Sequence, residues 1–131
     1  MPAVTIDIRC AYTIEQEINL INAVHVALVS AFKIPENDRD VRLFVHEPHR
    51  FQCPPNIEHP EYFTLIRIDC FAGRSLEAKR HLYQSLVENV SMLGIPKDHI
   101  KIILREIPLE NWGIRGGKAA CDVVLGFEVK V

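Results

Sequence analysis

The sequence predicts an α+β fold in which two β-α-β units form a four-stranded mixed sheet, with two long helices on one face and a short strand near the C-terminus. Apolar residues alternate with polar ones in several short segments, as in strands, and recur every three or four positions in two long segments, as in helices. The segment 6–10, Ile-Asp-Ile-Arg-Cys, also aligns with the segment 66–70, Ile-Arg-Ile-Asp-Cys, about 60 positions later. We therefore interpret the chain as a duplicated β-α-β unit.

Length and composition indicate one folded domain. The chain has 131 residues, of which 48% are hydrophobic and 24% are charged, close to the average for globular proteins. We predict a single domain over 1–131, with repeats at about 1–47 and 61–108 and a C-terminal extension at 109–131. The net charge of -2 provides no excess positive charge for a phosphate backbone, so no nucleic-acid partner is expected.

The first repeat is predicted to contain a strand at 3–9, a helix at 14–32 and a strand at 41–46. Thr13 and Gln16 have the spacing of a capping box at the start of the helix. Four of the eight prolines then fall within 48–60, which predicts a long loop. This loop either closes over an active site or packs against a neighbouring subunit.

The second repeat begins with a predicted strand at 62–71, after which Ser75 starts a helix that ends before Gly94. An apolar strand is predicted at 100–104. A glycine-rich segment follows, and a last short strand is predicted at 123–129.

One face of the predicted sheet has no helix to cover it. We interpret that face as rich in Ile and Val, so we expect it to be buried against other copies of the chain in a homo-oligomer. The longest uncharged segment of the first helix is too short and too polar to span a membrane, and the N-terminus lacks the basic and apolar regions of a secretory signal. We therefore expect no membrane partner and a cytoplasmic location.

The cysteines and histidines do not have the spacing of a metal site. The four cysteines lack any C-x-x-C pair, and we interpret Cys10 and Cys70 as small buried strand residues. His46, His49 and His59 lie on or beside the proline-rich loop without a matching pair of ligands elsewhere. Neither a disulfide framework nor a metal site is expected.

Three motifs carry a resemblance to a known family. They are Ile34-Pro35-Glu36-Asn37-Asp38-Arg39 after the first helix, Ala72-Gly73-Arg74-Ser75 before the second, and Asn111-Trp112-Gly113-Ile114-Arg115-Gly116-Gly117 near the C-terminus. Together with Pro2 after the initiator Met and the two β-α-β units, they resemble the tautomerase superfamily, which includes 4-oxalocrotonate tautomerase. The motifs are most similar to the malonate semialdehyde decarboxylase branch.

The resemblance implies that Met1 is removed and that the free nitrogen of Pro2 is the catalytic acid or base. Burial near a cation lowers the pKa of an amine, so such a nitrogen could exchange protons near neutral pH. The implied reaction is enol–keto tautomerisation, or decarboxylation, of a small oxo carboxylic acid. No cofactor is implied, and the expected assembly is a homotrimer.

Arg74 and Asp38 are the other catalytic candidates that the resemblance implies. Arg74 precedes a helix N-terminus and could bind a carboxylate through two hydrogen bonds, although an arginine in a loop is often simply solvated. Asp38 could orient the substrate or only cap a turn. The decarboxylase branch has a second arginine where this chain has Ala72, which argues against malonate semialdehyde as the substrate.

Trp112, Arg115 and Arg39 are candidates for substrate binding. Trp112 could form an apolar wall over the substrate or could anchor the core or a subunit contact. Arg115 and Arg39 could bind a carboxylate or lie exposed to solvent. The alternative hypothesis is a catalytically silent trimer that retains Met1 and binds a small anion or a protein through the Trp112 region.

Overall fold

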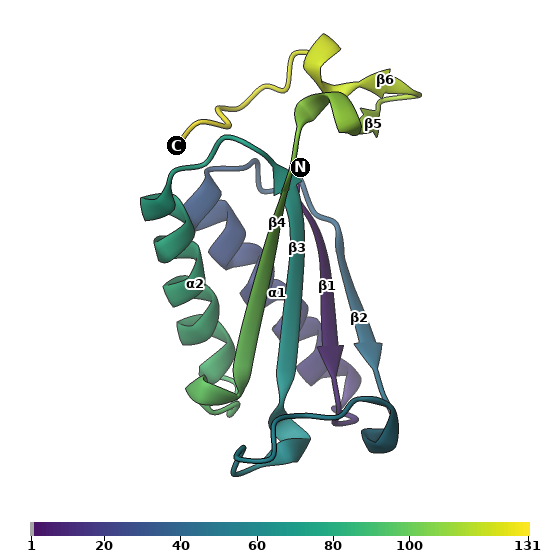
Figure 1. The fold of residues 1–131 in the computed structure, drawn as a ribbon, viewed down its shortest axis with the longest axis vertical. Helices are drawn as coiled ribbons and strands as arrows, with labels where there is room; N and C mark the ends of the chain where they lie inside the picture. The colour runs from purple at the N-terminus through teal and green to yellow at the C-terminus, as the bar shows by residue number, and fades with distance from the viewer. Residues whose placement is uncertain (1) are drawn as a thin grey trace.

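A four-stranded sheet, in the order β2-β1-β3-β4, is covered on one face by two helices (Figure 1). The computed structural model describes residues 2–131. In chain order the main elements are β1 (Ala3–Ile8), α1 (Ile14–Phe32), β2 (Val41–Val45), β3 (Thr64–Phe71), α2 (Leu76–Ser91) and β4 (Ile100–Ile107). The predicted fold class, with β-α-β connections and a mixed sheet, is therefore confirmed.

Strand pairing defines two ends of this sheet. β1 is parallel to β2 and antiparallel to β3, and β3 is parallel to β4. As a result β1 and β2 begin at the same end of the sheet at which β3 and β4 finish. We call this the Pro2 end and the opposite one, where residues 46–63 connect β2 to β3, the loop end (Figure 1).

Local sequence signals set the helix ends. The Thr13 hydroxyl accepts a hydrogen bond from the Gln16 amide, and the Gln16 side chain accepts one from the Thr13 amide, so the predicted capping box is confirmed. Lys33 ends α1 with a φ of 56°. The Ser75 hydroxyl caps α2 by accepting from the Ala78 amide.

The core lies between the helices and one face of the sheet. Alternate residues of β1 and β3 pack there against the apolar stripes of both helices, and the fully buried members include Val4, Ile6, Ile8, Leu20, Val24, Leu28, Ile66, Ile68, Leu82 and Leu86. Burial of this surface is the main driving force for folding. Within residues 2–131 no helix is long and apolar enough to cross a bilayer.

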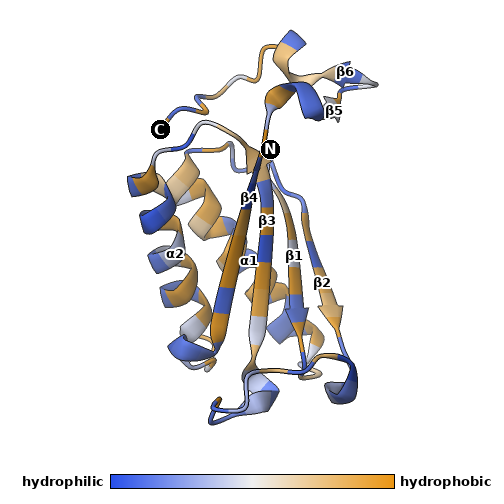
Figure 2. Cartoon of the chain, in the orientation of Figure 1, coloured by the Kyte–Doolittle hydropathy of each residue, from blue (hydrophilic) through white to orange (hydrophobic). Residues whose placement is uncertain are grey.

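The open face of the sheet differs from our prediction, because it carries charge pairs rather than mainly Ile and Val. Asp7, which is buried, accepts hydrogen bonds from Arg67 at 2.9 Å and lies 2.7 Å from the His46 ring. Arg105 binds the carboxylate of Asp69 on the neighbouring strand. Figure 2 shows hydrophilic and hydrophobic residues alternating along these strands, as expected when successive side chains point to opposite faces.

Two smaller predictions, the strand at 123–129 and the burial of Cys10 in a strand, are also wrong. Residues 123–129 form no strand; the short C-terminal strands are instead β5 (Gly113–Ile114) and β6 (Lys118–Ala119), which pair as a hairpin. Cys70 is buried in β3 as predicted, but Cys10 is only half-buried and follows the end of β1. The described cysteines are all free thiols.

Candidate active site

Pro2 is buried at the Pro2 end, directly before β1. The antiparallel register pairs Ala3 with Asp69, which places Pro2 beside the end of β3, next to Cys70. On the other side of β1, the Val4 amide donates a hydrogen bond to the Asp40 carbonyl at 2.9 Å. The N-terminal proline therefore lies between the end of β3 and the segment that leads into β2.

Arg74 is buried at the same end of the sheet, with only 5% of its surface exposed. One terminal nitrogen, Nη1, donates to the Phe71 carbonyl at 3.1 Å, and the guanidinium carbon lies 4.7 Å from the centre of the Phe32 ring. Nε and Nη2 are also buried but have no hydrogen-bond partner among the described residues. Because buried polar groups are nearly always paired, these two donors are available to a ligand or to water.

Electrostatics at Arg74 are dominated by burial. Burial lowers the pKa of the guanidinium, and the nearby Cys70 and Asp38 act in the opposite direction. An arginine remains charged nonetheless. The pKa of the Cys70 thiol is raised to about 11, mainly by burial, so this thiol stays protonated at neutral pH and is not a nucleophile.

The turn that presents Arg74 is held by Glu106, a residue that sequence reasoning missed. Glu106 near the end of β4 accepts hydrogen bonds from the Gly73 amide at 3.3 Å and from the Lys79 ammonium of α2. The hydrogen bond with Lys79 is the main reason that the pKa of Glu106 is lowered. Gly73 has a φ of 135°, which residues with a side chain rarely adopt.

A cleft of about 350 Å³ brings together two of the predicted site residues, Asp38 and Arg115. Pro2 and Arg74 do not line it, but Asp38 is near enough to Arg74 to favour the charged guanidinium. The other lining residues are Pro35, Asn37, Leu125 and Phe127. Asp38 is half-buried, and its backbone amide donates to the Pro35 carbonyl at 3.0 Å. The geometry thus combines a carboxylate and two arginines, one of them buried, at the end of the sheet where Pro2 lies.

Trp112 and Arg39 do not line this cleft. Trp112 donates its indole N–H to the Ile107 carbonyl and packs edge-on against Phe71 at 5.0 Å, in a second apolar cluster with Val129 and Ala120. Arg39 is exposed and donates to the Asn22 side chain of α1 at 2.6 Å. The apolar wall of the cleft comes instead from Leu125 and Phe127, which no local pattern distinguishes.

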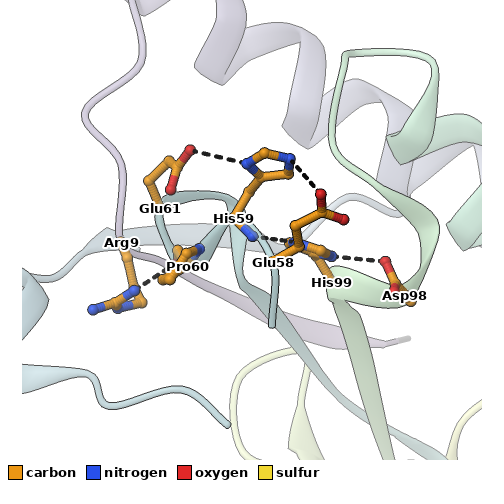
Figure 3. A network of polar contacts seen from close by, with 7 residues as sticks. All are labelled: Arg9, Glu58, His59, Pro60, Glu61, Asp98 and His99. Carbon is orange, nitrogen blue, oxygen red and sulfur yellow. Dashed lines mark hydrogen bonds and ion pairs between the residues drawn. The ribbon is translucent and has the colours of Figure 1, made fainter. Parts of the chain in front are cut away.

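The three histidines considered as metal ligands, His46, His49 and His59, lie at the other end of the sheet. His46 binds Asp7, and the His59 backbone amide donates to the ring of His99 at 3.0 Å (Figure 3). Among residues 2–131 no group of three His, Cys, Asp or Glu side chains is arranged to hold a metal ion. The loop 48–60 belongs to this loop end, so it does not cover Pro2 of its own chain (Figure 1).

Comparisons with known proteins identify the family and the fold. A family model described as tautomerase enzyme matches residues 38–115. A probable tautomerase of Ralstonia nicotianae (strain ATCC BAA-1114 / GMI1000) is 38% identical over 53 residues, which are 40% of this chain and 76% of that protein.

Two solved structures share the fold. Malonate semialdehyde decarboxylase is 25% identical, with a TM-score of 0.82 over 93% of this chain and 99% of that one. A fused 4-OT solved as an asymmetric trimer has a TM-score of 0.82 at 21% identity, over 92% of this chain and 97% of that one, which shows the fold alone. From the match of the family model, the chain belongs to the tautomerase superfamily.

Proposed function

We propose that this protein catalyses the enol–keto tautomerisation of a small oxo carboxylic acid, with the Pro2 nitrogen as acid and base and Arg74 as the carboxylate anchor. The main support is Arg74, a buried cation with two free donors at the same end of the sheet as a buried N-terminal proline. A guanidinium with two free N–H groups fits a planar carboxylate.

The proposed reaction moves one proton. The neutral Pro2 nitrogen takes the proton from the enol oxygen, and a carbonyl group forms. The nitrogen then returns the proton to the carbon next to the new carbonyl carbon, at the other end of the former C=C bond. The positive charge of Arg74 stabilises the negative charge that develops on the substrate. This chemistry requires a free secondary amine and therefore the removal of Met1, which lies outside the described residues.

Asp38 and Arg115 complete the proposed site. Both line the cleft, so Asp38 can orient the reacting end of the substrate and Arg115 can bind a second polar group. Arg39 and Trp112 are not part of the proposal, since their contacts are to α1 and to the C-terminal cluster. Homotrimer formation is proposed from the trimeric fused 4-OT alone.

Decarboxylation is the second reaction to test, because malonate semialdehyde decarboxylase shares the fold over nearly the whole chain. Ala72 stands where the motif of that branch has another arginine. This departure argues against malonate semialdehyde as the substrate, so tautomerisation is the reaction tested first.

The test combines N-terminal mass with kinetics. Ketonisation of phenylenolpyruvate and 2-hydroxymuconate is measured for the wild type, Pro2→Ala, Arg74→Ala and Arg80→Ala, the last being an exposed arginine of α2 that serves as the matched control. We expect Pro2→Ala to lower kcat by about 10²-fold or more, Arg74→Ala to raise KM, and Arg80→Ala to change neither. Unchanged rates in the first two variants, or Met1 on most molecules from the natural host, contradict the mechanism.

A silent member of the fold that binds an anion is the other candidate function. The observation in its favour is that Arg74 is almost completely enclosed. It predicts that a small carboxylate raises the melting temperature while no turnover of the enol acids is detected.

A further inference from the structure

Residues 123–131, which we call the C-terminal strap, cross the Pro2 end beside the start of α2 (Figure 1). The Ser75 amide donates a hydrogen bond to the backbone oxygen of Val131 at 2.9 Å. Val129 is buried, with 9% of its surface exposed, and its side chain lies so close to Gly73 that a Cβ there would be 3.2 Å from Val129 Cγ1. The strap thus packs directly on the turn that carries Arg74.

Elsewhere the strap is anchored mainly by Phe127, whose ring stacks on Phe71 at 6.4 Å, and is otherwise less firmly attached than the core. It has no strand partner, Val124 is 86% exposed, and a hollow of about 590 Å³ lies between the strap and Ala72 and Leu109. Arg115 holds the strap at Val124 through a hydrogen bond of 2.7 Å to the backbone carbonyl. A segment with few buried contacts opens at a lower free-energy cost than the core.

The burial of Arg74 and its two unpaired nitrogens have opposite implications for ligand binding. Its two free nitrogens favour an anion, yet with 5% of its surface exposed the residue is out of reach of a substrate from solvent. The covering segment must therefore move before an anion can bind. Of the segments at this end of the sheet, the strap packs on the Arg74 turn and lies outside the four-stranded sheet and its two helices.

We infer that the C-terminal strap is a gate: it closes over Arg74 in the free protein and lifts from the start of α2 to admit a carboxylate, and Val129 is the residue that holds it closed. This rests on the proposed role of Arg74 as an anion site. Because only the open form binds, the apparent dissociation constant is the intrinsic one divided by the open fraction. Weakening the closed form should therefore strengthen anion binding.

The test compares Val129→Ser with Val124→Ser, an equivalent change at an exposed position of the same strap. Arg74 is modified with phenylglyoxal, an arginine-selective reagent, and the rate is followed by peptide mass spectrometry with the exposed Arg80 as internal reference. Relative to Arg80, we expect Arg74 to react slowly in the wild type and in Val124→Ser, and several-fold faster in Val129→Ser. The KM for phenylenolpyruvate should fall in Val129→Ser.

Equal Arg74 reactivity in all three proteins, or a higher KM in Val129→Ser, overturns the gate. If Val129→Ser does not fold, hydrogen exchange of the wild type decides: the Ser75 amide should exchange many-fold faster than the amides of Leu82 and Leu86 in the interior of α2. Equal protection at these positions overturns the proposal too. Reagent access and exchange need no turnover, so failure of the gate is distinguishable from failure of Pro2 catalysis.

Discussion

Two buried polar residues at opposite ends of the sheet, His99 and Arg74, differ in their hydrogen bonds, although the loop end also has buried atoms without a partner among the described residues, Arg9 Nε and Tyr12 Oη. At the loop end, His99 is 2% exposed and both ring nitrogens are used: Nε2 accepts from the His59 amide and Nδ1 donates to Asp98 at 2.7 Å (Figure 3). At the Pro2 end, Arg74 is equally enclosed but leaves Nε and Nη2 without partners among the described residues. Burial alone therefore does not separate the two residues, whereas their hydrogen bonds do.

Under the proposed function, His99 is a structural polar group and Arg74 is one that binds a ligand. A satisfied buried ring fixes the loop onto the start of β4, and its removal should cost stability. A buried cation with two unsatisfied nitrogens contributes less to stability, because its desolvation is only partly compensated. Variants of Arg74 should consequently lower activity more than stability, and variants of His99 should lower stability more than activity.

The largest expected effect is that of Arg74→Met on activity. Loss of the charged donors should lower kcat/KM for an enol acid by about 10³-fold, equivalent to about 4 kcal/mol. Stability should change little, since a buried charge that is only partly compensated is replaced by an apolar side chain. Steady-state kinetics and thermal melting test both parts, and a large drop in melting temperature would mean that Arg74 is structural after all.

His99→Ala should show the reverse behaviour. It leaves the His59 amide without its acceptor and creates a cavity, so we expect the free energy of unfolding to fall by about 3 kcal/mol. The activity of the folded fraction should persist, because His99 lies at the far end of the sheet. Denaturant unfolding measures the loss, and His81→Ala, at an exposed histidine of α2, is the control.

Trp112→Ala tests whether a buried polar residue whose hydrogen bond is satisfied is structural even at the Pro2 end. Trp112 lies at this end but is satisfied, because its N–H binds the Ile107 carbonyl and its ring packs on Phe71. We expect a loss of stability of about 2 kcal/mol, with Trp112→Phe losing less. A change in KM without loss of stability would instead identify Trp112 as a substrate contact.

Glu106→Gln should have the smallest effect and a defined pH dependence. The folded pKa of Glu106 is lowered, so its stabilising contribution is fully present above the ordinary glutamate pKa and is lost as the pH falls through the lowered folded value. Because the pair with Lys79 is partly exposed, we expect less than about 1 kcal/mol. Thermal melting from neutral pH to about pH 3 should bring the two proteins together at the acidic end.

Local signals predicted the elements well because those signals act over a few residues. The capping box of Thr13 and Gln16 and the apolar spacing of α1 both depend on neighbours within two turns of helix. The open face was misinterpreted although strand alternation already places Asp7 and Arg67 on it. That error concerned which face the apolar residues occupy, not where the strands lie.

The site was only partly predictable. Arg74 and Asp38 stand in recognisable motifs, whereas Glu106 and Phe127 act through contacts between distant segments that no local pattern records. Whether Arg74 was solvated or enclosed also depended on distant segments, such as the end of α1, where the Phe32 ring lies 4.7 Å from its guanidinium carbon. Contacts between distant segments cannot be predicted from the local spacing of apolar and polar residues.

The positions of the two chain ends affect how the protein should be prepared. Pro2 is buried at the start of β1, and Val131 accepts a hydrogen bond from the start of α2, both at the same end of the sheet. An affinity tag or fusion partner at either terminus would add its residues at the end of the sheet where Arg74 lies. An N-terminal tag would also keep the Pro2 nitrogen in an amide bond. Labels and surface attachments are better introduced in the exposed loop around Pro54 and Pro55, on the opposite side of the molecule.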